Sequence, residues 1–327
     1  MWLSVVNMER KGLGMKRWAW LAIAVGLFVG AGTSEAQSFP EKPISLVVAF
    51  AAGGSVDTMT RALAGPVGTI LGQPVVVENR TGAGGAVATT ALKTARPDGY
   101  ALVSVTSTTL TFDPQVSKLQ FGLEDFTTIA AIGEFQEAYV AVPARGWKSF
   151  QDLIEAAKKG PLTYGSSTQM DRVVTSVVSK QAGVQLTPVP SRGGADVMTA
   201  VLGGHVNFGY SAGIHYSHVA AGNMVVLASL GDKRLRAFPQ APTLRELGYD
   251  VASINYSIIL APKGLPQPVH ARLADAFARA AKDQAFTSLV GDRLNLGPLY
   301  LGPAELEQAL RAHAATYKHM LAAAPAQ

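Results

Sequence analysis

The chain has 327 residues, of which 48% are hydrophobic and 16% are charged, with a formal net charge of +5. This length suffices for two α/β domains, and the composition excludes disordered and fibrous proteins. Because the chain has no cysteine, disulfide scaffolds, thiolate metal sites, cysteine nucleophiles and an N-terminal lipoprotein anchor are all excluded.

The first 36 residues have the features of a secretory signal peptide. Four basic residues precede an apolar run from Trp18 to Gly32, and Ser34-Glu35-Ala36 supplies a small-x-small cleavage pattern. The run has 15 residues, fewer than the roughly 20 of a membrane-spanning helix, so we expect cleavage rather than anchoring. Cleavage of 36 of the 327 residues leaves 291, and losing four basic and two acidic side chains lowers the charge from +5 to +3. We therefore predict a periplasmic protein, with too little clustered charge to bind nucleic acid.

From residue 40 onward, short β-rich runs alternate with helical periodicity, which predicts parallel sheets with crossover helices. An almost continuous apolar strand at Ile44–Phe50 is followed by a glycine loop and by apolar residues at 56, 59, 63, 67 and 70, the spacing of one helix face. The same order of strand, glycine loop and helix is repeated at Val75–Glu78, Arg80–Gly85 and Ala86–Ala95, before a third strand at Ala101–Val105. Both loops would lie at the carboxyl ends of neighbouring strands, where open α/β sheets bind ligands.

A second α/β unit is predicted further along the chain. Its expected helices are Ser149–Lys159, Met170–Ala182 and Ala195–Leu202, and its expected strands are Leu162–Tyr164, Leu186–Val189, Val206–Tyr210 and Val225–Ser229. We expect the extended segments Ala138–Val142 and Ile254–Ala261 to connect the units, and the helices Gln267–Lys282 and Pro303–Leu321 to return to the first one. This order predicts a two-lobed clamshell with a double-strand hinge and a ligand cleft between the lobes.

Several segments resemble the Bug proteins, the periplasmic binding components of tripartite tricarboxylate transporters. The most specific are PEKPISLVVAFAAGGSVDTMTRAL (Pro40–Leu63) and VVVENRTGAGGAVATTAL (Val75–Leu92), followed by PDGYALV (Pro97–Val103). Further matches in family order are TYGSSTQM (Thr163–Met170), PVPSRGGADVMTAVLGGHVNF (Pro188–Phe208), FPQAPTLRELGYD (Phe238–Asp250) and LAPKGLP (Leu260–Pro266). Together they cover essentially the whole mature chain.

The resemblance implies a two-domain α/β fold like that of periplasmic binding proteins, in which each domain is a sheet flanked by helices. The expected boundaries are a signal peptide at 1–36, domain 1 at 37–139, domain 2 at 140–256 and a return to domain 1 at 257–327. It also implies a monomer that closes on a small organic carboxylate without covalent chemistry, metal or cofactor. Its partners would be the membrane subunits of a transporter, although a sensor role is the alternative.

The residues themselves point to carboxylate binding. Glycine lets backbone N–H groups approach a ligand closely, and each glycine loop begins a helix whose N-terminus is electropositive. Tight turns without a ligand are the alternative for the glycines, and helix caps, polar loops or an exposed arginine are the alternatives for the side chains. The candidate ligand-binding residues of the first domain are Phe50, Ala51, Ala52, Gly53, Gly54, Ser55, Asp57, Gly82, Ala83, Gly84, Gly85, Ser107 and Thr108. Those of the second domain are Ser166, Ser167, Thr168, Arg192, Gly193, Gly194 and Asp196.

The second domain departs from the usual family pattern. Gln169 stands where histidine is frequent, Ser191-Arg192 where tyrosine-lysine is frequent, Ala200 where aspartate is frequent, and Tyr256 where tryptophan is common. We therefore expect a ligand that keeps a carboxylate but differs elsewhere from citrate-like and amino-acid ligands.

One enzymatic alternative comes from the sequence Gly209-Tyr210-Ser211-Ala212-Gly213, which matches the G-x-S-x-G nucleophile elbow. Asp232 or Asp250 with His270 would complete a Ser…Asp…His order, so a secreted serine hydrolase using Ser211 is the competing hypothesis. His215 and His218 are spaced to share a helix face, but no third ligand follows at a standard metal-site spacing. The favoured interpretation remains a binding protein rather than an enzyme.

Overall fold

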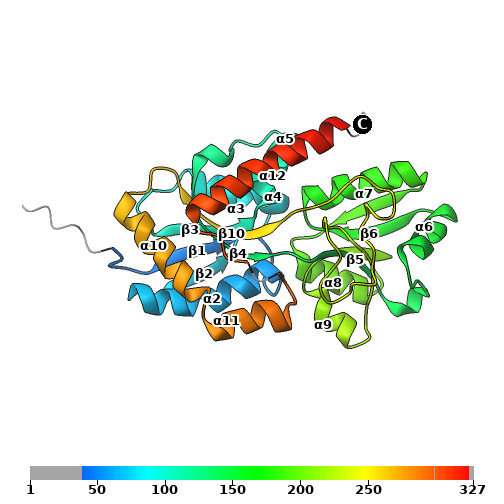
Figure 1. The fold of residues 1–327 in the computed structure, drawn as a ribbon, viewed down its shortest axis with the longest axis horizontal. Helices are drawn as coiled ribbons and strands as arrows, with labels where there is room; N and C mark the ends of the chain where they lie inside the picture. The colour runs from blue at the N-terminus through cyan, green and yellow to red at the C-terminus, as the bar shows by residue number, and fades with distance from the viewer. Residues whose placement is uncertain (1–38, 298, 324–327) are drawn as a thin grey trace, which may run out of the picture. The chain divides into compact units, whose positions relative to one another are not determined.

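The computed structural model describes residues 39–297 and 299–323 (Figure 1). The predicted signal peptide at 1–36 lies outside the described residues. The chain forms two five-stranded mixed sheets, each flanked by helices, which confirms the predicted fold class. We call each sheet with its helices a lobe.

The first lobe is built on the strand order β2-β1-β3-β10-β4. The strands β1, β2 and β3 are parallel, whereas β10 is antiparallel to both of its neighbours. Helices cover the sheet, so β1 reads as a nearly continuous apolar run, as predicted. The strands are β1 (Ile44–Val48), β2 (Val75–Asn79), β3 (Ala101–Thr106), β4 (Phe126–Glu134) and β10 (Tyr256–Pro262).

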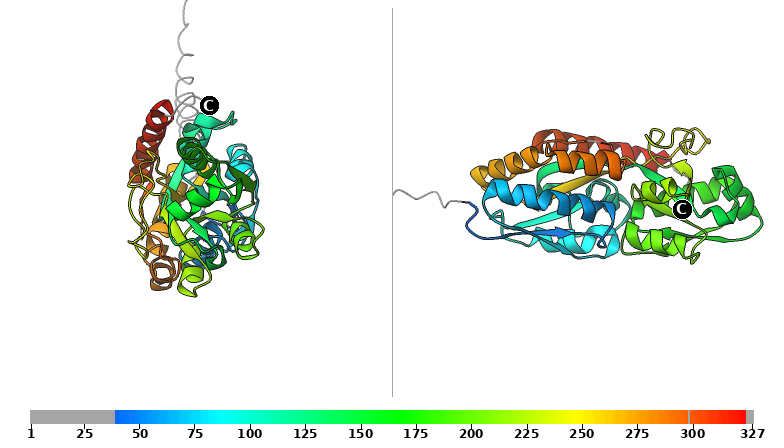
Figure 2. Two further views of the ribbon diagram at one scale, coloured as in Figure 1. Left: turned by 90° about the vertical axis from the view of Figure 1, so that its right-hand side faces the viewer. Right: turned by 90° about the horizontal axis from the view of Figure 1, so that it is seen from below.

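The helices of the first lobe come from both ends of the chain. The periodic stripe after β1 forms α2, whose positions 56, 59, 63 and 67 are buried as predicted. Near the C-terminus, α10 packs on α2 and β4, and α12 packs on β4 and α4. The right-hand view of Figure 2 shows α10, α11 and α12 along the same side. The helices are α2 (Ser55–Leu71), α3 (Ala86–Lys93), α4 (Thr108–Thr111), α5 (Asp113–Val116), α10 (Gln267–Ala280), α11 (Gln284–Ser288) and α12 (Pro303–Ala323).

The second lobe has the strand order β7-β6-β8-β5-β9. The strands β6, β7 and β8 are parallel, and β5 is antiparallel to β8 and β9. Its strands are β5 (Glu137–Ala141), β6 (Leu162–Ser166), β7 (Leu186–Pro190), β8 (Phe208–Ala212) and β9 (Val225–Ser229). Its helices are α6 (Phe150–Lys158), α7 (Gln169–Ala182), α8 (Gly194–Leu202) and α9 (His215–Ala220).

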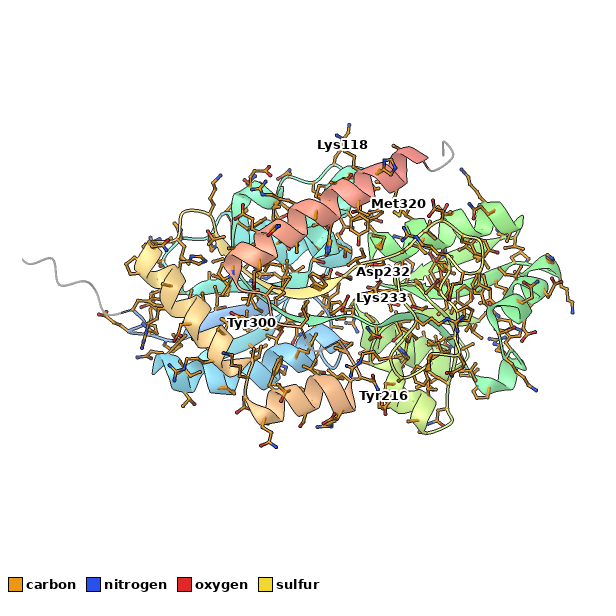
Figure 3. All side chains as sticks on the ribbon, in the orientation of Figure 1. Lys118, Tyr216, Asp232, Lys233, Tyr300 and Met320 are labelled. Atoms are coloured by element: carbon orange, nitrogen blue, oxygen red, sulfur yellow. The ribbon has the colours of Figure 1, made fainter. Side chains whose placement is uncertain are left out.

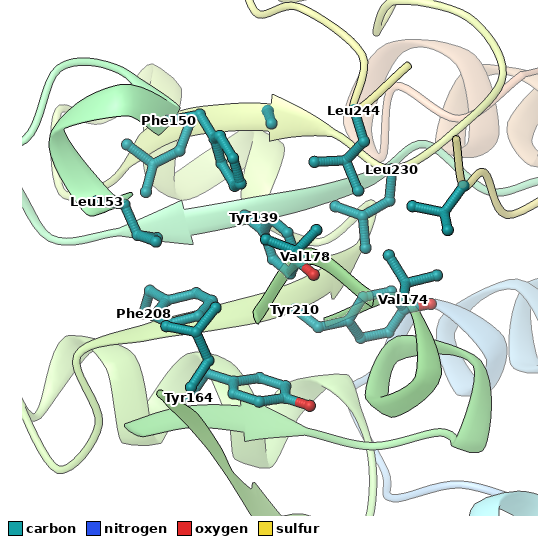
Figure 4. Packing of buried hydrophobic residues seen from close by; sticks show 14 of the residues in the cluster. Tyr139, Phe150, Leu153, Tyr164, Val174, Val178, Phe208, Tyr210, Leu230 and Leu244 are labelled. Carbon is teal, nitrogen blue, oxygen red and sulfur yellow. The ribbon is translucent and has the colours of Figure 1, made fainter. Parts of the chain in front are cut away.

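Aromatic side chains form much of the second lobe's core (Figure 4). The rings of Tyr164 and Phe208 stack with centroids 5.3 Å apart, and Tyr139 meets Phe208 edge-on at 5.4 Å. The buried Tyr139 hydroxyl forms a hydrogen bond of 2.6 Å with Thr175 Oγ1, so its polar end is satisfied. This rigid core supports the loops that follow β6 and β8.

The two segments expected to connect the lobes are strands of the sheets themselves. The residues expected at Ala138–Val142 form β5 of the second sheet, and those expected at Ile254–Ala261 form β10 of the first. The chain passes between the sheets just before each, at residues 135–136 and again between β9 and β10. Asp232 and Lys233, labelled in Figure 3, belong to this returning segment. The predicted boundary at 139–140 therefore falls inside β5, and the one at 256–257 falls at the start of β10.

Hydrogen bonds at the crossings join the two lobes. Asn255, just before β10, accepts from the Ser107 hydroxyl at 3.2 Å and donates to Glu137 Oε1 at 2.8 Å. The Tyr210 hydroxyl donates to the same oxygen. Burial raises the pKa of Glu137. These bonds fix the start of both crossing strands.

Candidate functional site

The first glycine turn, Phe50–Gly54, connects β1 to α2 and is held by a buried carboxylate. Gly53 has φ +79° and donates its N–H to Asp57 Oδ2 at 2.9 Å. The other oxygen of Asp57 accepts from Asn79 Nδ2 at 2.8 Å and from Arg61 Nε at 2.9 Å. Asn79 Nδ2 also donates to Phe50 O at 2.9 Å. Asp57, a candidate for ligand contact or helix-end compensation, thus holds the turn in place.

The second glycine turn, Gly82–Gly85, needs its glycines for their backbone conformation. Residues 82–85 have φ values of +142°, +47°, +66° and +103°, a region that residues with a side chain rarely adopt. A Cβ on Gly85 would lie 3.0 Å from Val105 Cγ2 and 3.5 Å from Ala49 Cβ. Because Ala49 directly precedes the first turn, the two glycine turns lie beside each other at one edge of the first sheet.

The hydroxyl groups predicted after β3 are engaged within the fold. Ser107 Oγ donates to Asn255 Oδ1 and accepts from Tyr256 N at 3.0 Å, while Thr108 Oγ1 donates to Thr106 Oγ1 at 3.2 Å. Both residues are at most 1% exposed. Their contacts support the crossing to β10. This agrees with the alternative given above, a polar loop whose side chains do not contact the ligand.

In the second lobe, the residues after β6 form a helix cap. Asp171 Oδ2 accepts from Ser167 N at 2.9 Å and from Thr168 N at 2.8 Å, and Thr168 Oγ1 accepts from Asp171 N at 3.1 Å. This is a capping box at the start of α7. Ser166 Oγ accepts from Arg172 Nη1 at 3.2 Å. The sequence analysis did not identify Asp171 or Arg172, although Thr168-x-x-Asp171 is a recognisable capping pattern.

Arg192, the predicted cationic contact, pairs inside its own loop. Its Nε lies 2.9 Å from Asp196 Oδ2, and its side chain is 75% exposed. This pair satisfies both side chains, as the alternative of an exposed loop arginine anticipates. The backbone of the same loop contributes more, because Arg192 O accepts from Ala51 N at 3.2 Å and so joins the lobes.

The predicted backbone segments of the two lobes meet. A Cβ on Gly54 would lie 3.8 Å from Gly194 N, and one on Gly193 would lie only 2.9 Å from Ala51 N. At the second turn, a Cβ on Gly84 would lie 3.8 Å from Gln169 N. The first glycine turn therefore faces the start of α8, and the second faces the start of α7.

Three of the helices that begin at this junction have a glycine at the N-cap position. The N-cap residues of α2, α3 and α8 are Gly54, Gly85 and Gly193, and none of the three ends has a side-chain cap. The first N–H groups of a helix have no intrahelical partner, and together with the helix dipole they attract anions. By contrast, Ser149 and Thr168 cap α6 and α7 with their side chains. The arrangement can bind a negatively charged group through backbone amides.

The proposed catalytic triad is not assembled. Ser211 is fully buried and its Oγ lies 3.0 Å from Nδ1 of the equally buried His215. Burial lowers the pKa of His215 to about 3, so its imidazole is neutral. His270, the expected third member, instead bonds Thr128 O at 2.9 Å in the first lobe. The Ser211–His215 pair is a buried structural contact.

The described residues contain neither a cluster of metal-ligating side chains nor a membrane-spanning helix. They contain no group of three or more His, Cys, Asp or Glu side chains arranged to hold a metal ion. None of their helices combines the length and apolarity that crossing a bilayer requires.

Comparison with known proteins gives consistent matches over most of the chain. The model of the tripartite tricarboxylate transporter family receptor matches residues 59–321. A Cupriavidus necator protein named "UPF0065 protein in gbd 5'region" is 32% identical over 290 residues, which cover 87% of this chain and 88% of that protein. The structure of the periplasmic binding protein BugD has a TM-score of 0.78 at 25% identity, covering 88% of this chain and 98% of BugD. MatC from Rhodopseudomonas palustris, solved with bound malate, has a TM-score of 0.76 at 23% identity. The match covers 86% of this chain and 99% of MatC.

Proposed function

This chain belongs to the tripartite tricarboxylate transporter receptor family and is a solute-binding protein rather than an enzyme, and we propose that it captures a small organic carboxylate in the periplasm. The resemblance to the Bug proteins is thereby confirmed. The serine hydrolase alternative has no support, because Ser211 is buried and His270 lies elsewhere.

The observation that carries this proposal is the set of three uncapped helix starts headed by glycine. Two belong to the first lobe and one to the second, and Gly54 and Gly194 bring α2 and α8 together. A carboxylate between them would accept hydrogen bonds from amides of Ala52–Ser55 and Gly82–Gly85, directly or through ordered water. Since the N–H groups of Gly53, Gly54 and Gly85 already donate within the turns, the remaining amides of Ala52–Ser55 and Gly82–Gly85 would carry most of the binding.

Small dicarboxylates are the first ligands to test. MatC, which shares the fold, was solved with malate, and a second carboxylate could be held by the start of α8. Gln169 bridges the lobes here by donating from Nε2 to Ser117 Oγ at 2.7 Å and accepting from Arg172. This departure from the usual histidine supports a ligand whose far end differs from citrate.

The binding cycle would couple ligand to lobe closure. Contacts that join both lobes, such as the Ala51–Arg192 hydrogen bond, exist only when the lobes are together, so a ligand between them shifts the equilibrium toward that state. We assign the part of the chain that carries β1 to β4 and the part that carries β10 to α12 to one domain, and the part that carries β5 to β9 to the other, with the crossings as the hinge. Membrane subunits of a transporter would recognise the ligand-bound state; in the alternative, the protein itself would serve as a sensor.

Thermal denaturation with malate, succinate, glutarate and adipate tests the proposal. The corresponding uncharged diamides serve as matched controls, because they keep the carbon chain and remove the charge. We expect at least one acid to raise the Tm and its diamide to leave it unchanged. Equal stabilisation by the acid and its diamide would contradict carboxylate recognition, and so would the failure of every acid.

A further inference from the structure

One oxygen of a buried carboxyl group beside the second glycine turn has no hydrogen-bond partner among the described residues. Asp113 begins α5 and is 2% exposed. Its Oδ2 lies 3.7 Å from the position that a Cβ would take on Gly84, and Thr168 Cα lies 3.8 Å from the same position. Its Oδ1 makes no hydrogen bond to any residue in 39–297 or 299–323. Oδ2 thus faces the junction between the lobes, and the carboxyl group keeps unused hydrogen-bonding capacity at Oδ1.

The surroundings of Asp113 favour its neutral form. Burial raises its pKa to about 8, with Arg172 opposing the shift and Asp171 adding to it. Both groups lie on α7, while α4, which also packs on α5, carries no charge. From α12, the buried His313 has a pKa lowered by burial, and the Tyr317 hydroxyl donates to Ile254 O at 2.7 Å. At neutral pH the carboxyl group therefore keeps its proton.

A protonated carboxyl group is a hydrogen-bond donor. A ligand oxygen placed beside it would receive that bond, and the positive charge of Arg172, which interacts with Asp113, would favour a negatively charged ligand group. A ligand ammonium would instead be repelled by that charge and find no ionised Asp113 carboxylate to pair with. Burial raises the pKa of Asp171 as well, and its Oδ2 accepts from two backbone N–H groups and the Thr168 hydroxyl.

We propose that Asp113 determines ligand specificity by donating a hydrogen bond from its neutral carboxyl group to an oxygen of the bound carboxylate. This inference rests on the proposed function and assigns it a ligand class, namely acids with an acceptor oxygen at the end that faces Gly84 and Thr168. Ligands with an ammonium group at that end are excluded.

Proton linkage gives the proposal a distinctive signature. An anion beside Asp113 holds the proton more tightly, so the bound state retains it to higher pH than the free state. The affinity should then fall roughly tenfold for each pH unit above about 8. Asp113→Asn keeps the size of the side chain and always donates from Nδ2, so its affinity should not change over this range. Asp113→Ala removes both the donor and the ionisable group, so its affinity should also not change with pH and should be roughly tenfold weaker than that of Asp113→Asn.

The test is calorimetric titration of the wild type and both variants with malate, succinate, glutarate and adipate between about pH 6 and pH 10. Binding of one acid to the wild type below about pH 7 would establish the proposed function separately from this inference. Affinity that is flat with pH in the wild type, or that rises with pH, would overturn the role of Asp113. So would an alanine variant that binds as well as the asparagine variant.

A second readout needs no ligand. In carboxyl ¹³C NMR of the unliganded protein, the resonance that disappears in Asp113→Asn should titrate near pH 8. Titration near the ordinary value of about 4 would overturn the proposal even if carboxylates bind.

Discussion

The substitution Gly193→Ala tests how the two lobes meet. Gly193 has φ +166°, an extended conformation that alanine adopts without strain, so the effect must come from the added methyl group. That methyl would lie 2.9 Å from Ala51 N, closer than a Cβ approaches backbone, and 3.3 Å from Ala51 Cβ. It therefore obstructs the contact at which Ala51 donates to Arg192 O.

The added methyl group raises the free energy of the state in which the lobes touch, and so weakens ligand binding. Losing one hydrogen bond costs about 1 kcal/mol, and forcing a methyl group into a packed contact costs about 1–3 kcal/mol. Partial relaxation of the loop reduces the sum, so we expect a loss of about 2–3 kcal/mol in binding free energy. This corresponds to a rise in Kd of roughly 30- to 150-fold.

The neighbouring Gly194→Ala is the matched control. Its Cβ would lie 3.6 Å from Ile214 Cδ1, an ordinary van der Waals distance, and alanine favours the helix that begins there. Calorimetric titration with the acid that raises the Tm most would compare the two variants. Kd values for both within about twofold of the wild type would refute the idea that the lobes close through this contact.

Three other substitutions probe the supporting structure. Asp57→Ala leaves the Gly53 N–H without its acceptor, so we expect a loss of about 2–4 kcal/mol in urea unfolding together with weaker carboxylate binding; unchanged stability would contradict its role in the turn. Because the pKa of Asp113 is about 8 in the folded protein and near 3.8 otherwise, the folded state holds the extra proton and wild-type stability falls as pH rises between these values. Asp113→Asn should therefore gain stability relative to the wild type as pH rises across that window, by about 5–6 kcal/mol at its upper end, and a difference between the two proteins that stays constant with pH would contradict this. Ser211→Ala leaves His215 Nδ1 unpaired, which should cost about 1–3 kcal/mol, while neither protein hydrolyses p-nitrophenyl acetate; wild-type hydrolysis abolished by the substitution would revive the hydrolase alternative.

Much of the fold follows from local patterns. The apolar stripe of α2 predicted its buried face, and the turn residues around each strand marked most of the sheets. By contrast, β4 was missed because its sequence FTTIAAIGE is buried on both faces and so has no alternation. The helices α4 and α5 have four residues each, too few to show a period.

The parts of the candidate site that depend on the conformation of a short segment could be predicted from the sequence. Gly82, Gly84 and Gly85 have positive φ values that favour glycine, so the turn is readable from the sequence. The pairing of Arg192 with Asp196, four residues later on the chain, also follows from local spacing, and the ligand contact of Arg192 stays a prediction. Asp113 gave no signal, because its importance depends on burial between α5 and α7, which only tertiary packing creates.

The most direct test of the account is a crystal structure of the protein with the acid that raises its Tm most. We predict a carboxylate group within about 3.2 Å of backbone nitrogens in Ala52–Ser55 or Gly82–Gly85, or one water away from them. A carboxylate bound at a distance from both glycine turns, with the starts of α2, α3 and α8 making no contact to it, would contradict the central claim.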